Sequence, residues 1–191
     1  MSGAYSPPLA PGVERALLRW PDVPAAFGWL SLDRRGHWSV PAGRITHPGT
    51  LAFLRSHYGA DAGGRWFVQN GPQRAFVTLD LAPWVLGLDG HGELVAFNGH
   101  RLAAPDMLVV SDEGDLLVAS EIGLGNVADR DLGRFVDALE APGAGSSVTE
   151  VLAGTVPGRL RFRGVELAVE CLAAAALPAR FGFVRQPAPG G

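Results

Sequence analysis

The alternation of apolar and polar residues predicts short strands joined by tight turns over most of the chain. Asp opens a recurring turn that Gly closes, because an Asp carboxylate accepts from nearby backbone N–H groups and Gly tolerates positive φ. Three such turns lie between apolar segments and predict hairpins, at residues 33–36, 89–92 and 112–115. A fourth, at 61–64, is expected to join a helix to a strand.

Helical spacing of apolar residues appears in three segments. Residues 13–20 follow the i, i+3, i+4, i+7 template, and Pro21 ends that pattern. Residues 47–58 and 128–140 each place apolar side chains on one face of a predicted helix. A Ser-x-x-Glu capping box at Ser147 predicts one further short helix.

These elements predict an α+β, β-rich fold of antiparallel hairpins with two or three short helices. Residues 29–80 and 107–170 share the order hairpin, helix, hairpin, which indicates an internal duplication. The second copy carries an insertion that begins at Pro142.

The duplication predicts two β-rich α+β units. We expect the first unit to span residues 13–83 and the second to span 84–185, with flexible termini at 1–12 and 186–191. A groove between two such units is a common place for a small ligand.

Composition narrows the class of protein. The chain has 191 residues, 47% hydrophobic and 18% charged, which is enough apolar content for a sizeable core. The net charge of −3 argues against nucleic-acid binding by bulk electrostatics. The start of the sequence lacks the pattern of a signal peptide, and the longest apolar run, 171–177, is too short to span a membrane. We therefore expect a soluble cytoplasmic protein without membrane contact.

No motif indicates a catalytic residue, a metal site or a cofactor. The Asp turns lack the alternating carboxylates of a calcium loop, and no two histidines have metal-ligand spacing on one helix. Cys171 is the single cysteine, so it forms no intramolecular disulfide, and its apolar neighbours predict a buried, inert thiol. A hydrolase that pairs an Asp with His47 or His57 stays open as a minor alternative.

One hairpin tip carries more polar chemistry than a turn needs. Asn70 and Gly71 are explained by turn geometry, whereas the polar side chains Gln69, Gln73 and Arg74 are not. They lie near the aromatic residues Trp66 and Trp84, which would wall a pocket, and Arg74 offers a planar fork for an anion. The alternative is an Arg–Gln network that only fixes the loop.

Three arginines recur at every second position, namely Arg159, Arg161 and Arg163. On a strand this spacing puts them on one face, where they could meet an acidic protein partner or another anion. The alternative is a solvated outer face whose charges pair with nearby acids.

Several stretches together resemble a family of uncharacterised proteobacterial proteins. They are GWLSLDRRGHW (28–38), ITH (45–47), GRWFVQNGPQR (64–74), DLAPW (80–84) and LPARFGFV (177–184). By the order of its motifs the chain also resembles, more distantly, the domain of unknown function 1285 family. That resemblance implies a two-part, β-rich α+β fold with repeated motifs and a ligand-binding or signalling role, without a catalytic motif.

The sequence thus favours a non-enzymatic module that binds a small anionic ligand or takes part in signalling. A protein–protein adaptor with an acidic partner is the main alternative.

Overall fold

The computed structural model describes residues 25–142 and 147–189. Within these residues strands predominate over short helices, so the expected α+β class is confirmed. The helix predicted at 13–20 and the N-terminal segment 1–12 lie outside the described residues.

Contacts within the chain group it into two compact units. The N-terminal unit comprises residues 25–83 and 182–189, and the C-terminal unit comprises 84–142 and 147–181. The sequence-based boundary put 182–185 with the second unit, but the backbone bonds this segment to the first. The amide of Val184 donates to the carbonyl of Gly64 over 2.9 Å, and the amide of Leu79 donates to the carbonyl of Arg185 over 2.8 Å.

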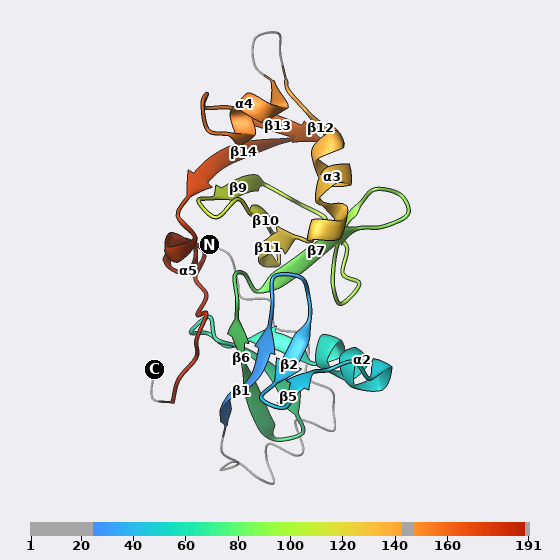
Figure 1. The fold of residues 1–191 in the computed structure, drawn as a ribbon, viewed down its shortest axis with the longest axis vertical. Helices are drawn as coiled ribbons and strands as arrows, with labels where there is room; N and C mark the ends of the chain where they lie inside the picture. The colour runs from blue at the N-terminus through green and yellow to red at the C-terminus, as the bar shows by residue number, and fades with distance from the viewer. Residues whose placement is uncertain (1–24, 143–146, 190–191) are drawn as a thin grey trace. The chain divides into compact units, whose positions relative to one another are not determined.

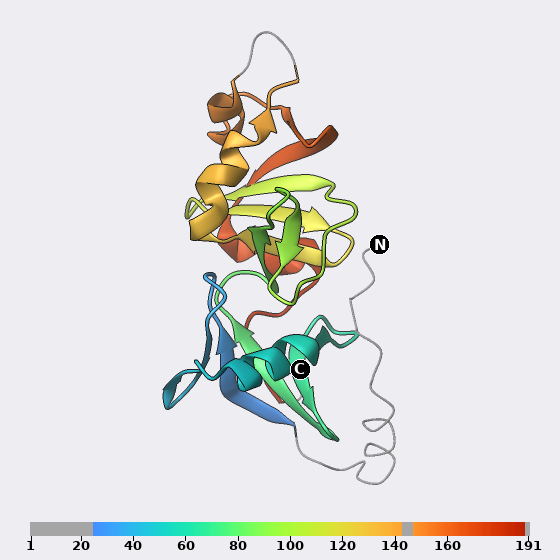
Figure 2. The same cartoon turned by 90° about the vertical axis from the view of Figure 1, so that its right-hand side faces the viewer.

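The N-terminal unit is a six-stranded sheet with the order β3-β2-β1-β6-β5-β4 (Figure 1). Its strands are β1 (Ala26–Leu32), β2 (Trp38–Val40), β3 (Gly43–Arg44), β4 (Tyr58–Ala60), β5 (Trp66–Asn70) and β6 (Gln73–Leu79). Helix α2 (Pro48–Ser56) connects β3 to β4 and lies across one face of the sheet (Figure 2). The side chain of His47 caps it by accepting from the amide of Thr50.

The C-terminal unit is an eight-stranded sheet with the order β12-β13-β14-β9-β10-β11-β7-β8. Its strands are β7 (Trp84–Leu88), β8 (Leu94–Ala96), β9 (Met107–Ser111), β10 (Leu116–Ser120), β11 (Gly123–Val127), β12 (Leu139–Glu140), β13 (Arg159–Phe162) and β14 (Val165–Leu172). Its helices are α3 (Asp129–Asp137), α4 (Val148–Leu152), the 3₁₀ turn η1 (Ala174–Ala176) and α5 (Leu177–Phe181).

The topology confirms the internal duplication. The series β1, β2, β3, α2, β4, β5, β6 matches β9, β10, β11, α3, β12, β13, β14 in strand order. In both copies the first and last strands pair in parallel and the other neighbours pair antiparallel. The second copy differs by α4, which lies in the predicted insertion and has the predicted capping box at Ser147. The hairpin β7–β8 lies outside both copies and extends the second sheet beyond β11.

Four turns share one hydrogen-bond pattern, in which the opening side chain accepts from the amides two and four residues later. They are opened by Asp33, Asp61, Asp89 and Ser111. The turn expected at 112–115 therefore begins one residue earlier, because the Ser111 hydroxyl takes the acceptor role. The turn at Asp61 joins β4 to β5 and not a helix to a strand, since α2 already ends at Ser56.

Large aromatic side chains fill the core of the N-terminal unit. Trp38, Tyr58 and Trp66 are all buried. The ring of Tyr58 stacks on Trp66 at 4.8 Å between centroids and meets Trp38 edge-on at 5.5 Å. Burial raises the pKa of Tyr58 well above its usual value, and its hydroxyl donates to the carbonyl of Pro83 over 2.8 Å. Such a pair of rings adds about 0.5–1.5 kcal/mol beyond its buried area.

Candidate functional site

The polar tip between β5 and β6 forms an internal network. Gln69 is buried, and its amide nitrogen donates to the carbonyl of Gly71 over 2.7 Å. Its side-chain oxygen accepts from Nε of Arg74 over 3.2 Å, and the Arg74 guanidinium lies 4.5 Å from the centre of the Phe67 ring. The carbonyl of Gln73 lies 3.4 Å from the same Gln69 nitrogen. This is the geometry that a loop-fixing network requires, and contact between Arg74 and a ligand stays a prediction.

The two tryptophans expected beside this tip are core residues. Trp66 is 4% exposed and stacks on Tyr58 in the N-terminal unit. Trp84 is fully buried in the C-terminal unit, where its indole nitrogen donates to the carbonyl of Ile122 over 2.8 Å. Both rings are therefore used for packing within their own unit.

The arginine series of β13 keeps only two members on one face. Arg159 and Arg161 each lie 3.3 Å from a carboxylate oxygen of Glu166 on β14, so one acid pairs with both. Arg163 departs from the series because β13 ends at Phe162 and the chain turns there. Its φ is 49°, and it forms with Gly164 the two-residue loop of the β13–β14 hairpin. The expectation that all three share a face is wrong for Arg163.

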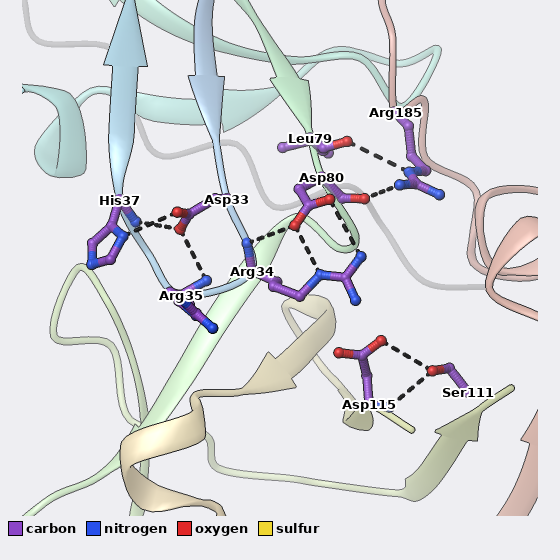
Figure 3. A network of polar contacts seen from close by, with 9 residues as sticks. All are labelled: Asp33, Arg34, Arg35, His37, Leu79, Asp80, Ser111, Asp115 and Arg185. Atoms are coloured by element: carbon purple, nitrogen blue, oxygen red, sulfur yellow. Dashed lines mark hydrogen bonds and ion pairs between the residues drawn. The ribbon is translucent and has the colours of Figure 1, made fainter. Parts of the chain in front are cut away.

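A polar clamp in the N-terminal unit surrounds the end of β6 (Figure 3). Arg34 contacts both carboxylate oxygens of Asp80, with Nε at 2.8 Å and Nη2 at 3.3 Å. Arg185 donates to the carbonyls of Leu79 and Asp80, and thereby ties the C-terminal segment to the sheet. The hydrogen bonds from Arg34 lower the pKa of Asp80. These groups satisfy one another, so their arrangement explains folding and not ligand capture.

The described residues also show where the candidate metal ligands and the single cysteine lie. Among these residues, no group of three His, Cys, Asp or Glu side chains is placed to hold a metal ion. No described helix is long and apolar enough to cross a membrane. Cys171 is exposed, contrary to the buried thiol expected, because it lies near the end of β14, where neither face is fully covered.

The C-terminal unit contains a half-open cavity of about 330 Å³. One wall comes from the segment that begins at Glu93 and contains β8 and the loop after it. The other wall is the β13–β14 hairpin turn. The apolar lining is Leu94, Leu102, Ala103, Pro105, Phe162 and Val165, and two charged residues, Glu93 and Arg163, complete it. The exposed lining is mixed, with polar and apolar surface in similar amounts, and small-molecule sites combine apolar walls with a few polar groups.

The cavity exists because the eight-stranded sheet curls. Strands β13 and β8 are separated by five strands in the sheet order, yet their turns are bonded to each other. Nη1 of Arg163 donates to the carbonyl of His91, in the β7–β8 turn, over 2.9 Å. The turn of the added hairpin therefore meets the turn of β13–β14, and the cavity lies at this seam.

Glu121 anchors the loop that forms one wall. Its carboxylate accepts from the amides of Ala103 and Ala104 over 2.7 and 3.0 Å, and Nε2 of His100 lies 3.6 Å away. Burial would raise the pKa of Glu121, but the backbone amides that donate to it outweigh this effect together, and the pKa is lowered. A carboxylate held by two amides fixes the wall in place before any ligand arrives.

Of the cavity residues, sequence reasoning had singled out only Arg163, and for a different role. Glu93 lies directly after a turn and carries no motif. One signal was available: Arg163-Gly164 takes the place where a two-residue hairpin loop usually has Asn-Gly or Gly-Gly. A long charged side chain there indicates a use beyond the turn.

Comparison with known proteins places the chain in a family. The sequence matches the DUF2944 family model, described as "Protein of unknown function (DUF2946)", over residues 11–188. No curated protein matches it. The crystal structure of a DUF1285 family protein from Silicibacter pomeroyi DSS-3 is similar, with a TM-score of 0.53 and 14% identity, covering 75% of this chain and 80% of that one. A DUF1285 family protein from Shewanella baltica OS155 gives a TM-score of 0.42 and 16% identity, over 58% and 91% of the two chains.

The similarity to the first of these structures shows a shared fold and confirms the resemblance to the 1285 family seen in the sequence. The family model spans most of the sequence. The chain therefore belongs to the DUF2944 family of proteins of unknown function.

Proposed function

We propose that this protein is a small-ligand-binding module without enzymatic activity, and that its ligand carries a carboxylate held by Arg163 in the seam cavity. The cavity is a hollow of the right size class, since pockets for small molecules begin at about 300 Å³. Its apolar walls exclude water from the ligand's body, and the guanidinium supplies a planar fork for a carboxylate.

The observation that carries this proposal is the backbone conformation of Arg163. Among residues 25–142 and 147–189, it is the one non-glycine residue with positive φ. That conformation costs about 1 kcal/mol or more for a residue with a Cβ. Strained residues gather at binding sites, where the surrounding structure holds them in a useful position. The two-residue loop favours positive φ at both of its residues, and here one of them carries a charged side chain that lines the cavity.

A thermal-shift screen tests the proposal with three variants. The library contains small carboxylates, amino acids, nucleotides and uncharged analogues, since a ligand at one hundred times its Kd stabilises by about 2.7 kcal/mol. Arg163→Gln removes the cavity guanidinium. Arg159→Gln makes the same chemical change on β13, at a residue outside the cavity lining. Arg74→Gln tests the polar tip that the sequence singled out.

We expect a ligand whose stabilisation is lost in Arg163→Gln and kept in both other variants. A ligand lost only in Arg74→Gln would move the site to the β5–β6 tip and contradict the placement at the seam. Equal stabilisation of all variants by every ligand, or no stabilisation at all, would reject ligand binding through Arg163.

A further inference from the structure

The seam cavity carries charges of both signs, which narrows the class of ligand further than the proposed function does. Glu93 and Arg163 both line it, and Oε1 of Glu93 lies 3.8 Å from Nη2 of Arg163. That separation is beyond hydrogen-bond distance, so the two groups form an ion pair without a hydrogen bond, and their side chains are 48% exposed for Arg163 and 38% for Glu93. The other terminal nitrogen of Arg163, Nη1, donates a hydrogen bond to the carbonyl of His91. Nη2 and Oε1 are thus the donor and the acceptor that the cavity offers to a ligand.

The ionic cluster of Asp89, Glu93, Arg101 and Arg163 is balanced in charge. Arg101 contacts Asp89 Oδ2 at 3.0 Å and Glu93 Oε2 at 2.9 Å. The Arg101 guanidinium therefore balances one of the two carboxylates. The remaining negative charge is balanced by Arg163, which lies beside Glu93. A ligand with a lone carboxylate would add a negative charge beside Glu93. A ligand with both a carboxylate and an ammonium group leaves the cluster neutral.

The apolar part of the cavity requires an apolar body on the same ligand. Of the apolar lining, Leu94 and Phe162 are each 3% exposed, whereas Val165 is 45% exposed. A bound apolar side chain would cover Val165 and remove it from water, which stabilises by about 25 cal/mol per Å² buried. The volume of about 330 Å³ suits one small molecule and not a peptide segment.

We propose that the ligand is an apolar α-amino acid, bound with its carboxylate at Arg163, its ammonium at Glu93 and its side chain on the wall formed by Leu94, Leu102 and Phe162. This inference rests on the proposed function, because it names the ligand class of the same cavity. Each ionic contact is a charge-assisted hydrogen bond, in a pocket that excludes water on one side.

Isothermal titration with three related compounds separates the ligand's two charges. Leucine carries both charges, 4-methylpentanoate lacks the ammonium, and 3-methylbutylamine lacks the carboxylate. We expect leucine to bind about tenfold or more tightly than either analogue, because each lost contact is charge-assisted. Phenylalanine in place of leucine tests the apolar wall with a larger side chain.

Two cavity variants and two matched controls test the partners. Glu93→Gln should lower the affinity for leucine by about tenfold, and it should leave the affinity for 4-methylpentanoate unchanged or higher. Arg163→Gln should lower the affinity for both compounds. Glu140→Gln and Arg159→Gln make the same changes at exposed positions outside the cavity lining and should alter neither. If a cavity variant fails to fold, NMR of the unaltered protein takes its place. Adding leucine should then shift the methyl signals of Leu94 and Leu102.

The outcomes distinguish the class of ligand from the function itself. If 4-methylpentanoate binds as tightly as leucine and Glu93→Gln leaves leucine unchanged, the amino-acid inference is wrong while binding of a carboxylate at Arg163 stands. If neither leucine nor phenylalanine shifts the methyl signals, but another carboxylate does, the class is again wrong. If no compound depends on Arg163, both proposals fail.

Discussion

Nη1 of Arg163 donates to the backbone carbonyl of His91 over 2.9 Å, across 72 positions of sequence. This bond closes the seam of the eight-stranded sheet, and it is made by a residue whose φ of 49° is unfavourable for arginine. The hydrogen bond and the backbone conformation therefore make opposing demands on this position.

Replacing Arg163 with Asn should separate these two demands. Asn tolerates the left-handed region, so the relief of strain offsets the lost hydrogen bond, and the free energy of unfolding should change by less than about 1 kcal/mol. Arg163→Val places a β-branched residue at positive φ and should be less stable than Arg163→Asn by about 1–2 kcal/mol. Urea denaturation measures both. Equal stability of the two variants would show that the backbone at 163 is not strained.

The network at the β5–β6 tip should be visible as coupling between Arg74 and Gln69. Arg74→Met keeps an apolar chain over Phe67 but leaves the buried oxygen of Gln69 without its donor, at a cost of about 1–2 kcal/mol. Gln69→Met removes the partner. A double-mutant cycle on unfolding free energies should give a coupling of about 0.5–1.5 kcal/mol, whereas strictly additive effects would show that the two side chains act independently.

The Arg34–Asp80 pair should make stability depend on acid pH. Hydrogen bonds from Arg34 lower the pKa of Asp80 in the folded protein. A lowered folded pKa gives stability that is present above the unfolded value of about 3.9 and is lost as the pH falls through the folded value. Because the Asp80 side chain is 41% exposed, solvent screens the pair and limits the effect to about 1 kcal/mol.

Asp80→Asn should therefore be less stable than the unaltered protein at pH 7, and the difference should shrink below about pH 4. Arg34→Met should show the same narrowing, since it removes the cause of the shift. Unfolding followed by circular dichroism from pH 2 to pH 7 provides the curves. A difference that stays constant over this range would contradict the assignment of the pair.

Two glycines with similar φ separate strain from close packing. Gly64 and Gly114 have φ of 73° and 87°. An added Cβ would overlap the carbonyl of Gly182 at the first and meet nothing within 4 Å at the second. Gly114→Ala should cost about 1 kcal/mol from strain alone, and Gly64→Ala should cost about 1–3 kcal/mol more. Limited proteolysis should then cut the segment after Gly182 faster in Gly64→Ala only.

Local chemistry explains which features the sequence could predict. The turn at Asp33 needs only a carboxylate and a glycine at fixed spacing, and the capping box at Ser147 needs only two side chains, so both follow from short patterns. The repeated order of elements follows from the same kind of signal. The seam cavity requires the curl of a whole sheet and a contact between Arg163 and His91, which no local spacing encodes.

The burial of individual side chains was also predicted incorrectly from the sequence. Gln69 lies in β5, where the preceding residues are buried on both faces of the strand. Its polar side chain was expected to be exposed, although it is 3% exposed. Cys171 shows the reverse, since an apolar neighbourhood in sequence does not guarantee a covered face at the end of β14. Alternation alone does not tell which faces of a strand another layer will cover.

The β7–β8 hairpin belongs to neither copy of the duplicated unit, yet the segment that begins with it supplies one whole wall of the cavity. Selection can therefore change residues 93–105 without disturbing the ladders that the two copies have in common. The repeats form the common frame of the two units, and under the proposed function the hairpin with its loop would determine which ligand fits. If the proposed function holds, exchanging this one segment would change the small molecule that is recognised and leave the fold unchanged.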